Sequence, residues 1–120
     1  MTHKLTSILI VEDDPFIALD LQDFFLDEGY NVIGPTATSS GGLSLLDAQS
    51  PDCALLDYNL LSDTSGKIAT RLDREKIPYI FLTGQINRVV SSVHPSIPIV
   101  SKPFDPFEIR TAINQILQTA

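Results

Sequence analysis

Four apolar runs along this chain each end in side chains that could take part in chemistry. The first run is followed by Glu12 and Asp13, the second ends in Asp57, and the later two end in Thr83 and Lys102. If the runs are parallel strands, their carboxyl ends lie at one edge of a sheet, where ligands bind in sheets of this kind. An acidic pair, a lone aspartate, a hydroxyl and an ammonium would then share one pocket. That set suits a carboxylate that accepts a phosphoryl group with the help of a divalent cation.

The acidic residues predict a metal site. Glu12, Asp13 and Asp57 would lie within a few ångströms of one another, and two like charges about 4 Å apart repel by roughly 4 kcal/mol at an effective dielectric near 20. A bound cation or a shared proton relieves this repulsion. Hard oxygen ligands suit Mg²⁺, with Mn²⁺ as an alternative. Asp57 would then be the nucleophile that forms an acyl phosphate.

The remaining residues of the pocket would contact the phosphoryl group. Lys102 would pair with it as a mobile point charge, and the Thr83 hydroxyl would donate to another phosphoryl oxygen. Gly84 would keep the neighbouring backbone open to a close approach. Asp14 fits a different role, because Asp14-Pro15 is a good helix start and an aspartate there caps free amides.

Strands and helices alternate regularly along the sequence, which predicts a parallel sheet covered on both faces. Caps and stops support several boundaries: Gly29 ends the first helix, and Asp105-Pro106 begins the last. Gly41-Gly42 should cost the second helix roughly 1 kcal/mol per glycine relative to alanine. The predicted strands cover about 5–11, 31–34, 53–57, 79–83 and 97–102, and the helices about 15–28, 40–48, 65–75 and 106 onward.

Size and composition indicate one cytoplasmic domain. The chain has 120 residues, 43% of them hydrophobic, and no apolar stretch approaches the roughly 20 residues needed to span a bilayer. Cys53 is the only cysteine, so it is expected to be a small core residue. The formal net charge of −7 argues against direct nucleic-acid binding, which depends on basic contacts to phosphates.

As an ordered set, the motifs resemble the receiver domain of two-component response regulators. The matching segments are ILIVEDDP (8–15), LLDYNL (55–60), FLTG (81–84) and SKPF (101–104). The resemblance implies a flavodoxin-like, doubly wound sheet of five parallel strands in the order 2-1-3-4-5. It implies that Asp57 takes a phosphoryl group from a histidine kinase or phosphotransfer protein. It also implies that Asp13 and Asp57 bind Mg²⁺ directly, Glu12 through water and Asn59 through its backbone carbonyl, and that the Lys102-Pro103 bond is commonly cis.

Three features depart from the usual receiver pattern. Leu61 stands where the family usually has proline, in a loop that looks one residue longer than usual. Ile99 occupies the position of the aromatic residue that often acts as the output switch. The interval 85–96 is rich in serine and β-branched residues, which predicts a fourth helix that is short, mobile or absent. A subgroup of stand-alone receivers with a Phe-x-Thr-Gly motif and a remodelled fourth helix is similar.

The expected function is that of a single receiver domain over residues 1–120 that switches contacts with an unknown downstream protein. Asp20, Gln22 and Asp23 on the first helix form an expected kinase-docking face. Asn59 and Gln85 flank the pocket and could tune a slow self-catalysed dephosphorylation.

Three other interpretations stay open. One is a phosphate sink or relay with little conformational output, which Ile99 favours slightly. Another is a Mg²⁺-dependent phosphohydrolase, although Asn59 stands where such enzymes often carry a general acid. The third is that the chain is a piece of a hybrid kinase or a larger regulator.

Overall fold

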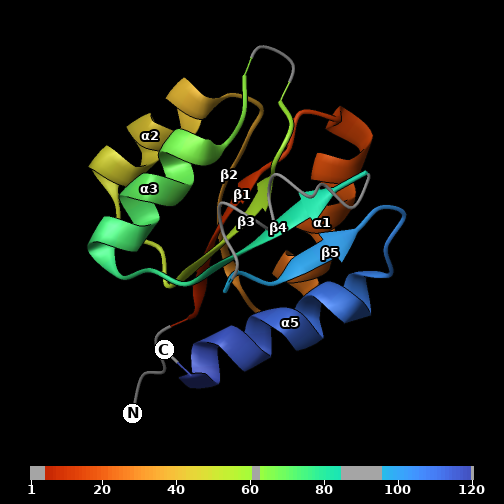
Figure 1. Ribbon diagram of the computed structural model, residues 1–120. Helices are drawn as coiled ribbons and strands as arrows, with labels where there is room; N and C mark the ends of the chain where they lie inside the picture. Colours follow the sequence, from red (N-terminus) through yellow and green to blue (C-terminus); the bar gives the residue numbers. More distant parts are fainter. Residues whose placement is uncertain (1–4, 61–62, 85–95, 120) are drawn as a thin grey trace.

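The computed structural model describes residues 5–60, 63–84 and 96–119, and it places a five-stranded parallel sheet between two layers of helices (Figure 1). The strand order is β2-β1-β3-β4-β5, which confirms the predicted order 2-1-3-4-5. The strands are β1 (Ser7–Val11), β2 (Asn31–Thr36), β3 (Cys53–Asp57), β4 (Tyr79–Thr83) and β5 (Ile99–Ser101). The described helices are α1 (Pro15–Asp27), α2 (Ser39–Ala48), α3 (Gly66–Glu75) and α5 (Pro106–Thr119).

The core has two halves because the strands carry apolar residues on both faces. Helices α2 and α3 cover one face of the sheet, and α1 and α5 cover the other (Figure 1). In β3, Ala54 and Leu56 pack toward α2 and α3, whereas Cys53 and Leu55 pack toward α1 and α5. Alternate side chains of a strand point to opposite faces, so the continuous apolar run is what a strand buried on both sides requires.

The helix starts follow the predicted capping chemistry. The Asp14 carboxylate accepts from the amides of Phe16 (2.9 Å) and Ile17 (3.3 Å), so Asp14 is a cap, as expected. Asp105 accepts from the Phe107 amide at 3.0 Å in the same way. Gly29, just past α1, has a φ of +88°, which is the left-handed conformation that favours glycine after a helix.

Gly42 shows that the glycine pair in α2 does more than weaken a helix. A Cβ at Gly42 would lie 2.5 Å from Cδ1 of Ile68, which is buried in α3. The absence of a side chain therefore lets the two helices pack closely. Sequence spacing cannot reveal this requirement, because it depends on a neighbour 26 positions away in the chain (68 minus 42).

Some predicted features differ from the structure or fall outside it. The last strand is shorter than the predicted 97–102, and α2 begins one residue earlier than predicted. The segment 85–95, on which the fourth-helix prediction falls, lies outside the described residues, as do Leu61 and Ser62. Among the described residues, no helix is both long and apolar enough to cross a membrane.

Candidate functional site at the carboxyl ends of the strands

The strand register brings the predicted site residues to one edge of the sheet. Val11 pairs with Leu56, so Glu12 and Asp57 each follow a paired residue on adjacent strands. Thr83 pairs with Ser101, and the Lys102 amide donates to the Thr83 carbonyl at 2.7 Å. The structure therefore brings all four strand ends to the same rim, as predicted.

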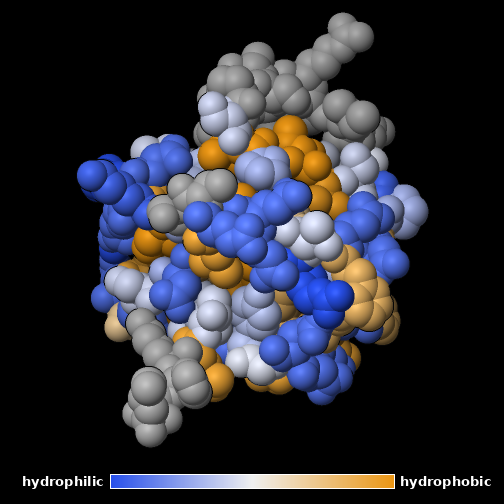
Figure 2. All heavy atoms as spheres, turned by 90° about the horizontal axis from the view of Figure 1, so that it is seen from below, coloured by the Kyte–Doolittle hydropathy of each residue, from blue (hydrophilic) through white to orange (hydrophobic). Residues whose placement is uncertain are grey.

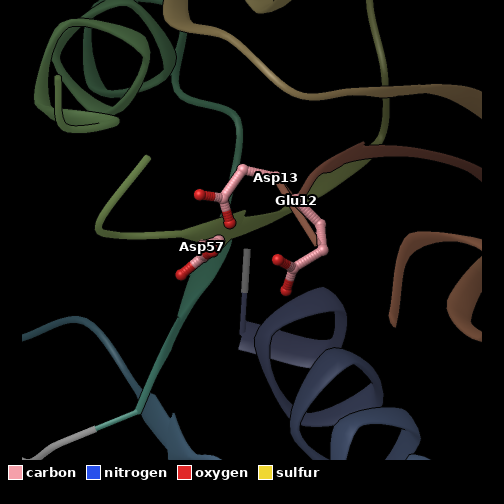
Figure 3. Close-up of side chains that lie close together, drawn as sticks. All are labelled: Glu12, Asp13 and Asp57. Atoms are coloured by element: carbon pink, nitrogen blue, oxygen red, sulfur yellow. The ribbon is translucent and has the colours of Figure 1, made fainter. Parts of the chain in front are cut away.

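Three carboxylates form a compact cluster at this rim. One oxygen from each of Glu12, Asp13 and Asp57 lies within 4.8 Å of the other two, and Figure 3 shows these side chains gathered at the ends of β1 and β3. Glu12 and Asp57 are buried, whereas Asp13 is partly exposed. Asp13 is thus the side of the cluster that faces solvent.

Lys102 closes the cluster from the β5 side. Its Nζ lies 2.7 Å from Oε1 of Glu12 and 3.3 Å from Oδ2 of Asp57. The peptide bond between Lys102 and Pro103 is cis, in agreement with what the family resemblance implies. The ion pair with Glu12 was not predicted from the sequence, because it joins two ends that are separated by 90 positions (102 minus 12).

Burial and the crowding of charged groups shift the pKa values of Asp57 and Lys102. Burial raises the pKa of Asp57, and the neighbouring carboxyl groups of Asp13 and Glu12 raise it further, while the charge of Lys102 lowers it. Burial lowers the pKa of Lys102, but the hydrogen bond to Glu12 and the charge of Asp57 outweigh that effect, so this pKa lies above its usual value. The protein therefore favours a shared proton or a bound cation at the rim.

The other predicted residues lie around the cluster. Thr83 is buried at the end of β4, and Gly84 is exposed, with open space where a Cβ would stand. Asn59 is exposed and forms a single bridge with Thr64, which closes the loop after β3. Gln85 lies outside the described residues.

Ile99, the predicted switch position, is half-buried and pairs with Phe81 in the neighbouring strand. Tyr58 was missed by the sequence analysis, although it directly follows Asp57. Its half-buried ring meets Phe81 edge-on, with 5.3 Å between the ring centroids. Aromatic packing on this face is therefore supplied by Phe81 of β4 and by Tyr58, which follows β3, while β5 contributes an aliphatic side chain.

A hollow adjoins the site on the α1 side. Its volume is about 220 Å³, and it lies between α1 and the segment that leads from β5 into α5. The lining residues are Ile17, Asp20, Leu21, Lys102, Pro103, Phe104 and Pro106. Lys102 therefore belongs both to the acidic site and to the wall of this hollow.

Comparison with known proteins agrees with the geometry. Residues 8–114 match the family described as the response regulator receiver domain. The chain is 33% identical over 116 residues to the phyllosphere-induced regulator PhyR of Methylorubrum extorquens, covering 93% of this chain and 43% of PhyR. It is 36% identical over 115 residues to the TorCAD operon regulatory protein TorR of Escherichia coli, covering 92% of this chain and 49% of TorR. The chain thus spans less than half the length of these two relatives.

Solved structures show the same arrangement. The solution structure of SdrG from Sphingomonas melonis superposes with a TM-score of 0.83 at 34% identity, covering 97% of this chain and 99% of SdrG. A CheY-like receiver domain protein from Methanospirillum hungatei gives a TM-score of 0.85 at 26% identity, covering 97% of this chain and 96% of that one. The family match, the strand order and the position of the acidic rim agree, and the chain belongs to the response regulator receiver domains of two-component signalling.

Proposed function

We propose that this receiver domain accepts a phosphoryl group on Asp57 and thereby switches its contacts with a downstream protein. The observation that carries the proposal is the convergence of Asp57 with Asp13, Glu12 and Lys102 at one rim. Asp57 stands at the end of the central strand, with an oxygen beside a positive charge and two further carboxylates. That placement gives a nucleophile and the means to offset the charge of an incoming phosphoryl group.

The donor set fits a divalent cation. Carboxylate oxygens are the ligands that Mg²⁺ prefers, and the cluster pairs a partly exposed carboxylate, Asp13, with a buried one, Asp57. Asp13 and Asp57 would hold Mg²⁺ or Mn²⁺ directly, Asn59 would add its backbone carbonyl, and Glu12 would reach it through water. A bound cation would neutralise the carboxylates and offset negative charge on the phosphoryl oxygens.

In the proposed transfer, a carboxylate oxygen of Asp57 attacks the phosphorus of a phosphohistidine. The new O–P bond forms as the N–P bond breaks, and the electron pair of that bond returns to the histidine nitrogen, which then takes up a proton. Lys102 and the Thr83 hydroxyl would contact the phosphoryl oxygens, and Gly84 would leave room beside them. Hydrolysis of the acyl phosphate would be slow and tuned by Asn59 and Gln85, so the domain is a regulator and not an enzyme with turnover.

The donor would be a histidine kinase or phosphotransfer protein that binds beside α1 in the cytoplasm. Asp20 and Asp23 of the expected docking face are exposed, and Gln22 is half-buried. Two large apolar side chains, Phe16 and Leu19, are also exposed on this helix. The hollow between α1 and the start of α5 adjoins Lys102, so a partner bound there would reach the phosphoacceptor site.

The test is labelling with acetyl phosphate and Mg²⁺, read by intact mass. We expect a gain of one phosphoryl group that disappears in Asp57→Asn and when Mg²⁺ is removed by EDTA. Lys102→Ala should slow labelling, because it removes a cation that lies 3.3 Å from Asp57. Equal labelling of Asp57→Asn and the unaltered protein would reject Asp57 as the acceptor.

A phosphate sink or relay is the second candidate function, and Ile99 favours it. An aliphatic side chain in β5 cannot make the aromatic rotation that often reports phosphorylation in the family. The two functions differ in output. If the domain is a switch, phosphorylation creates binding to a downstream protein in a pull-down that compares labelled and unlabelled protein; a sink transfers the phosphoryl group efficiently without a change in binding.

A further inference from the structure

We infer that Glu12 acts as the positioning residue for Lys102, and that its contribution to metal binding is secondary. The inference rests on the proposed function and assigns a different task to one residue of the site. It begins from the two oxygens of Glu12. Oε1 forms an ion pair with Nζ of Lys102 at 2.7 Å, and Oε2 accepts a hydrogen bond from the backbone amide of Asp14 at 3.0 Å.

Burial makes both contacts necessary. The Glu12 side chain is 0% exposed, so water cannot solvate its charge. A buried carboxylate is tolerated only when it is paired and hydrogen-bonded. Glu12 meets that requirement with one cation and one amide of the protein itself. Asp13, by contrast, is partly exposed and has the freer approach for a hydrated metal ion.

The distances from Lys102 Nζ to the two carboxylates indicate which contact is the stronger. Lys102 Nζ is closer to Glu12 (2.7 Å) than to Asp57 (3.3 Å), so its strongest contact is with the residue that is not the phosphoacceptor. An ammonium tethered in this way stays beside Asp57 while that carboxylate changes its charge. The Lys102 ammonium is thereby held in place before the phosphoryl group arrives.

The length of Glu12 matters because β1 and β5 are not neighbours. The strands β3 and β4 lie between them, so the two strand ends are about 14 Å apart at the usual spacing. The long side chains of Glu12 and Lys102 together span this distance across the end of β3. Replacing Glu12 with aspartate would shorten the reach by about 1.5 Å, one carbon–carbon bond. The negative charge would remain, but its contact with Lys102 would be lost.

Three variants separate the positioning role from metal binding. Glu12→Asp keeps the charge and loses the reach. Glu12→Gln keeps the reach, but an amide offers one acceptor oxygen and so cannot serve both Lys102 and the Asp14 amide. Asp13→Asn is the matched control, because it changes the partly exposed carboxylate next to Glu12. The readouts are the Mg²⁺ dissociation constant from calorimetric titration and the labelling rate with acetyl phosphate at saturating Mg²⁺.

We expect both Glu12 variants to label about ten-fold more slowly at saturating Mg²⁺ while their Mg²⁺ dissociation constants stay within about three-fold of the unaltered protein. Asp13→Asn should weaken Mg²⁺ binding by about ten-fold or more. Because Glu12 acts through Lys102, the double variant Glu12→Gln/Lys102→Ala should be no slower than Lys102→Ala alone. The inference is overturned if Glu12→Gln weakens Mg²⁺ binding as much as Asp13→Asn, or if the effects on rate multiply.

A double-mutant cycle on unfolding tests the pair without any phosphorylation. Urea unfolding in EDTA of the four proteins of the Glu12→Gln and Lys102→Ala cycle should show a coupling of about ten-fold in the unfolding equilibrium constant. No coupling would overturn the inference on its own. If the unaltered protein takes no label from acetyl phosphate but the coupling is present, the proposed function fails and the Glu12–Lys102 pairing stands.

Discussion

Asp57 is both buried and close to other carboxylates, and both features disfavour its negative charge. It is buried at the end of β3, where it meets Lys102, yet burial beside Glu12 and Asp13 penalises its charge. Lys102 offsets part of the penalty, and the raised pKa of Asp57 shows that the compensation is incomplete. The site therefore has a stability cost that a cation would remove.

Removing one charge from the cluster should stabilise the metal-free protein. Asp57→Asn is expected to raise the free energy of unfolding in EDTA by about 1–2 kcal/mol, since it removes a like charge from a crowded, buried site. Urea unfolding followed by circular dichroism measures this change. Mg²⁺ should stabilise the unaltered protein more than the variant, because binding to the folded state adds to its stability. A destabilised Asp57→Asn protein would show that Lys102 pairing outweighs the repulsion.

Close packing of α2 on α3 depends on residues from different parts of the chain. Ile68 is buried in α3, and its Cδ1 atom occupies the space that a side chain at Gly42 would need. Overpacking of a core contact costs typically about 1–3 kcal/mol, partly offset here by the better helix propensity of alanine.

Gly42→Ala should therefore destabilise the domain by about 1 kcal/mol, and Ile68→Val alone by a similar amount. Valine lacks the Cδ1 atom that the new methyl group would meet. The double variant should thus lose less stability than the sum of the two single losses, which thermal unfolding of the four proteins measures. Strictly additive losses would mean that α2 moves away from α3 and leaves Ile68 in place.

The helix ends offer a matched pair of backbone tests. Lys76 ends α3 with a φ of +59°, and Gly29 follows α1 with a φ of +88°. Lys76→Gly should raise the free energy of unfolding by about 0.5–1 kcal/mol, because glycine adopts this conformation without the steric cost. Gly29→Ala should lower it by about 1 kcal/mol, although a Cβ there would meet no neighbouring atom within 4 Å. Similar effects of both changes would contradict this backbone explanation.

Features that depend on neighbouring residues in the sequence could be predicted, whereas contacts between distant residues could not. The caps at Asp14 and Asp105 and the stop at Gly29 follow from rules that act over a few residues, and the structure confirms them. The strand ends could be placed at one rim because parallel strands share an edge. The Glu12–Lys102 pair and the Gly42–Ile68 contact could not be predicted, because each depends on how side chains from separate elements meet.

Cys53 reports on the folding of the whole molecule. Its thiol is buried on the α1 and α5 face, near the Ser7 carbonyl at 3.8 Å, and burial raises its pKa to about 12. Only the thiolate reacts with alkylating reagents. Native Cys53 should therefore be alkylated through opening of the fold, at a rate that rises steeply with urea. Mass spectrometry measures the rate of alkylation. Fast alkylation without urea would contradict the burial of Cys53.

The Cys53 thiol also makes the free energy of unfolding depend on pH in the alkaline range. The pKa of Cys53 in the folded state is about 12, compared with an ordinary value of 9.0, so the unfolded chain loses this proton first as pH rises. The contribution of the neutral thiol to stability is therefore complete below about pH 9 and declines between about pH 9 and 12. Unfolding free energies of the unaltered protein and Cys53→Ala, compared across this range, should converge as pH rises.

Surface contacts link α1 and α5. Figure 2, seen from the side on which α5 lies, shows hydrophobic atoms in patches between hydrophilic side chains. Phe107 of α5 is exposed, its ring contacts Phe24 edge-on, and the Arg110 guanidinium lies 4.7 Å from the ring centroid. Glu28 pairs with the same arginine. These contacts tie the start of α5 to the end of α1, so the two helices that flank the hollow are joined as one unit.

The register of the central strand, β3, is fixed by burial and by pairing on both sides. Every residue of β3 is buried, and its neighbours on either side fix which face each side chain occupies. Deleting a single residue between Cys53 and Leu56 would exchange the side chains under the two helical layers. It would also pull the terminal carboxylate back by about 3.3 Å, one strand residue, out of reach of its partners. Insertions are therefore tolerated better in the loops around this rim than in β3, whose residue count sets the position of Asp57.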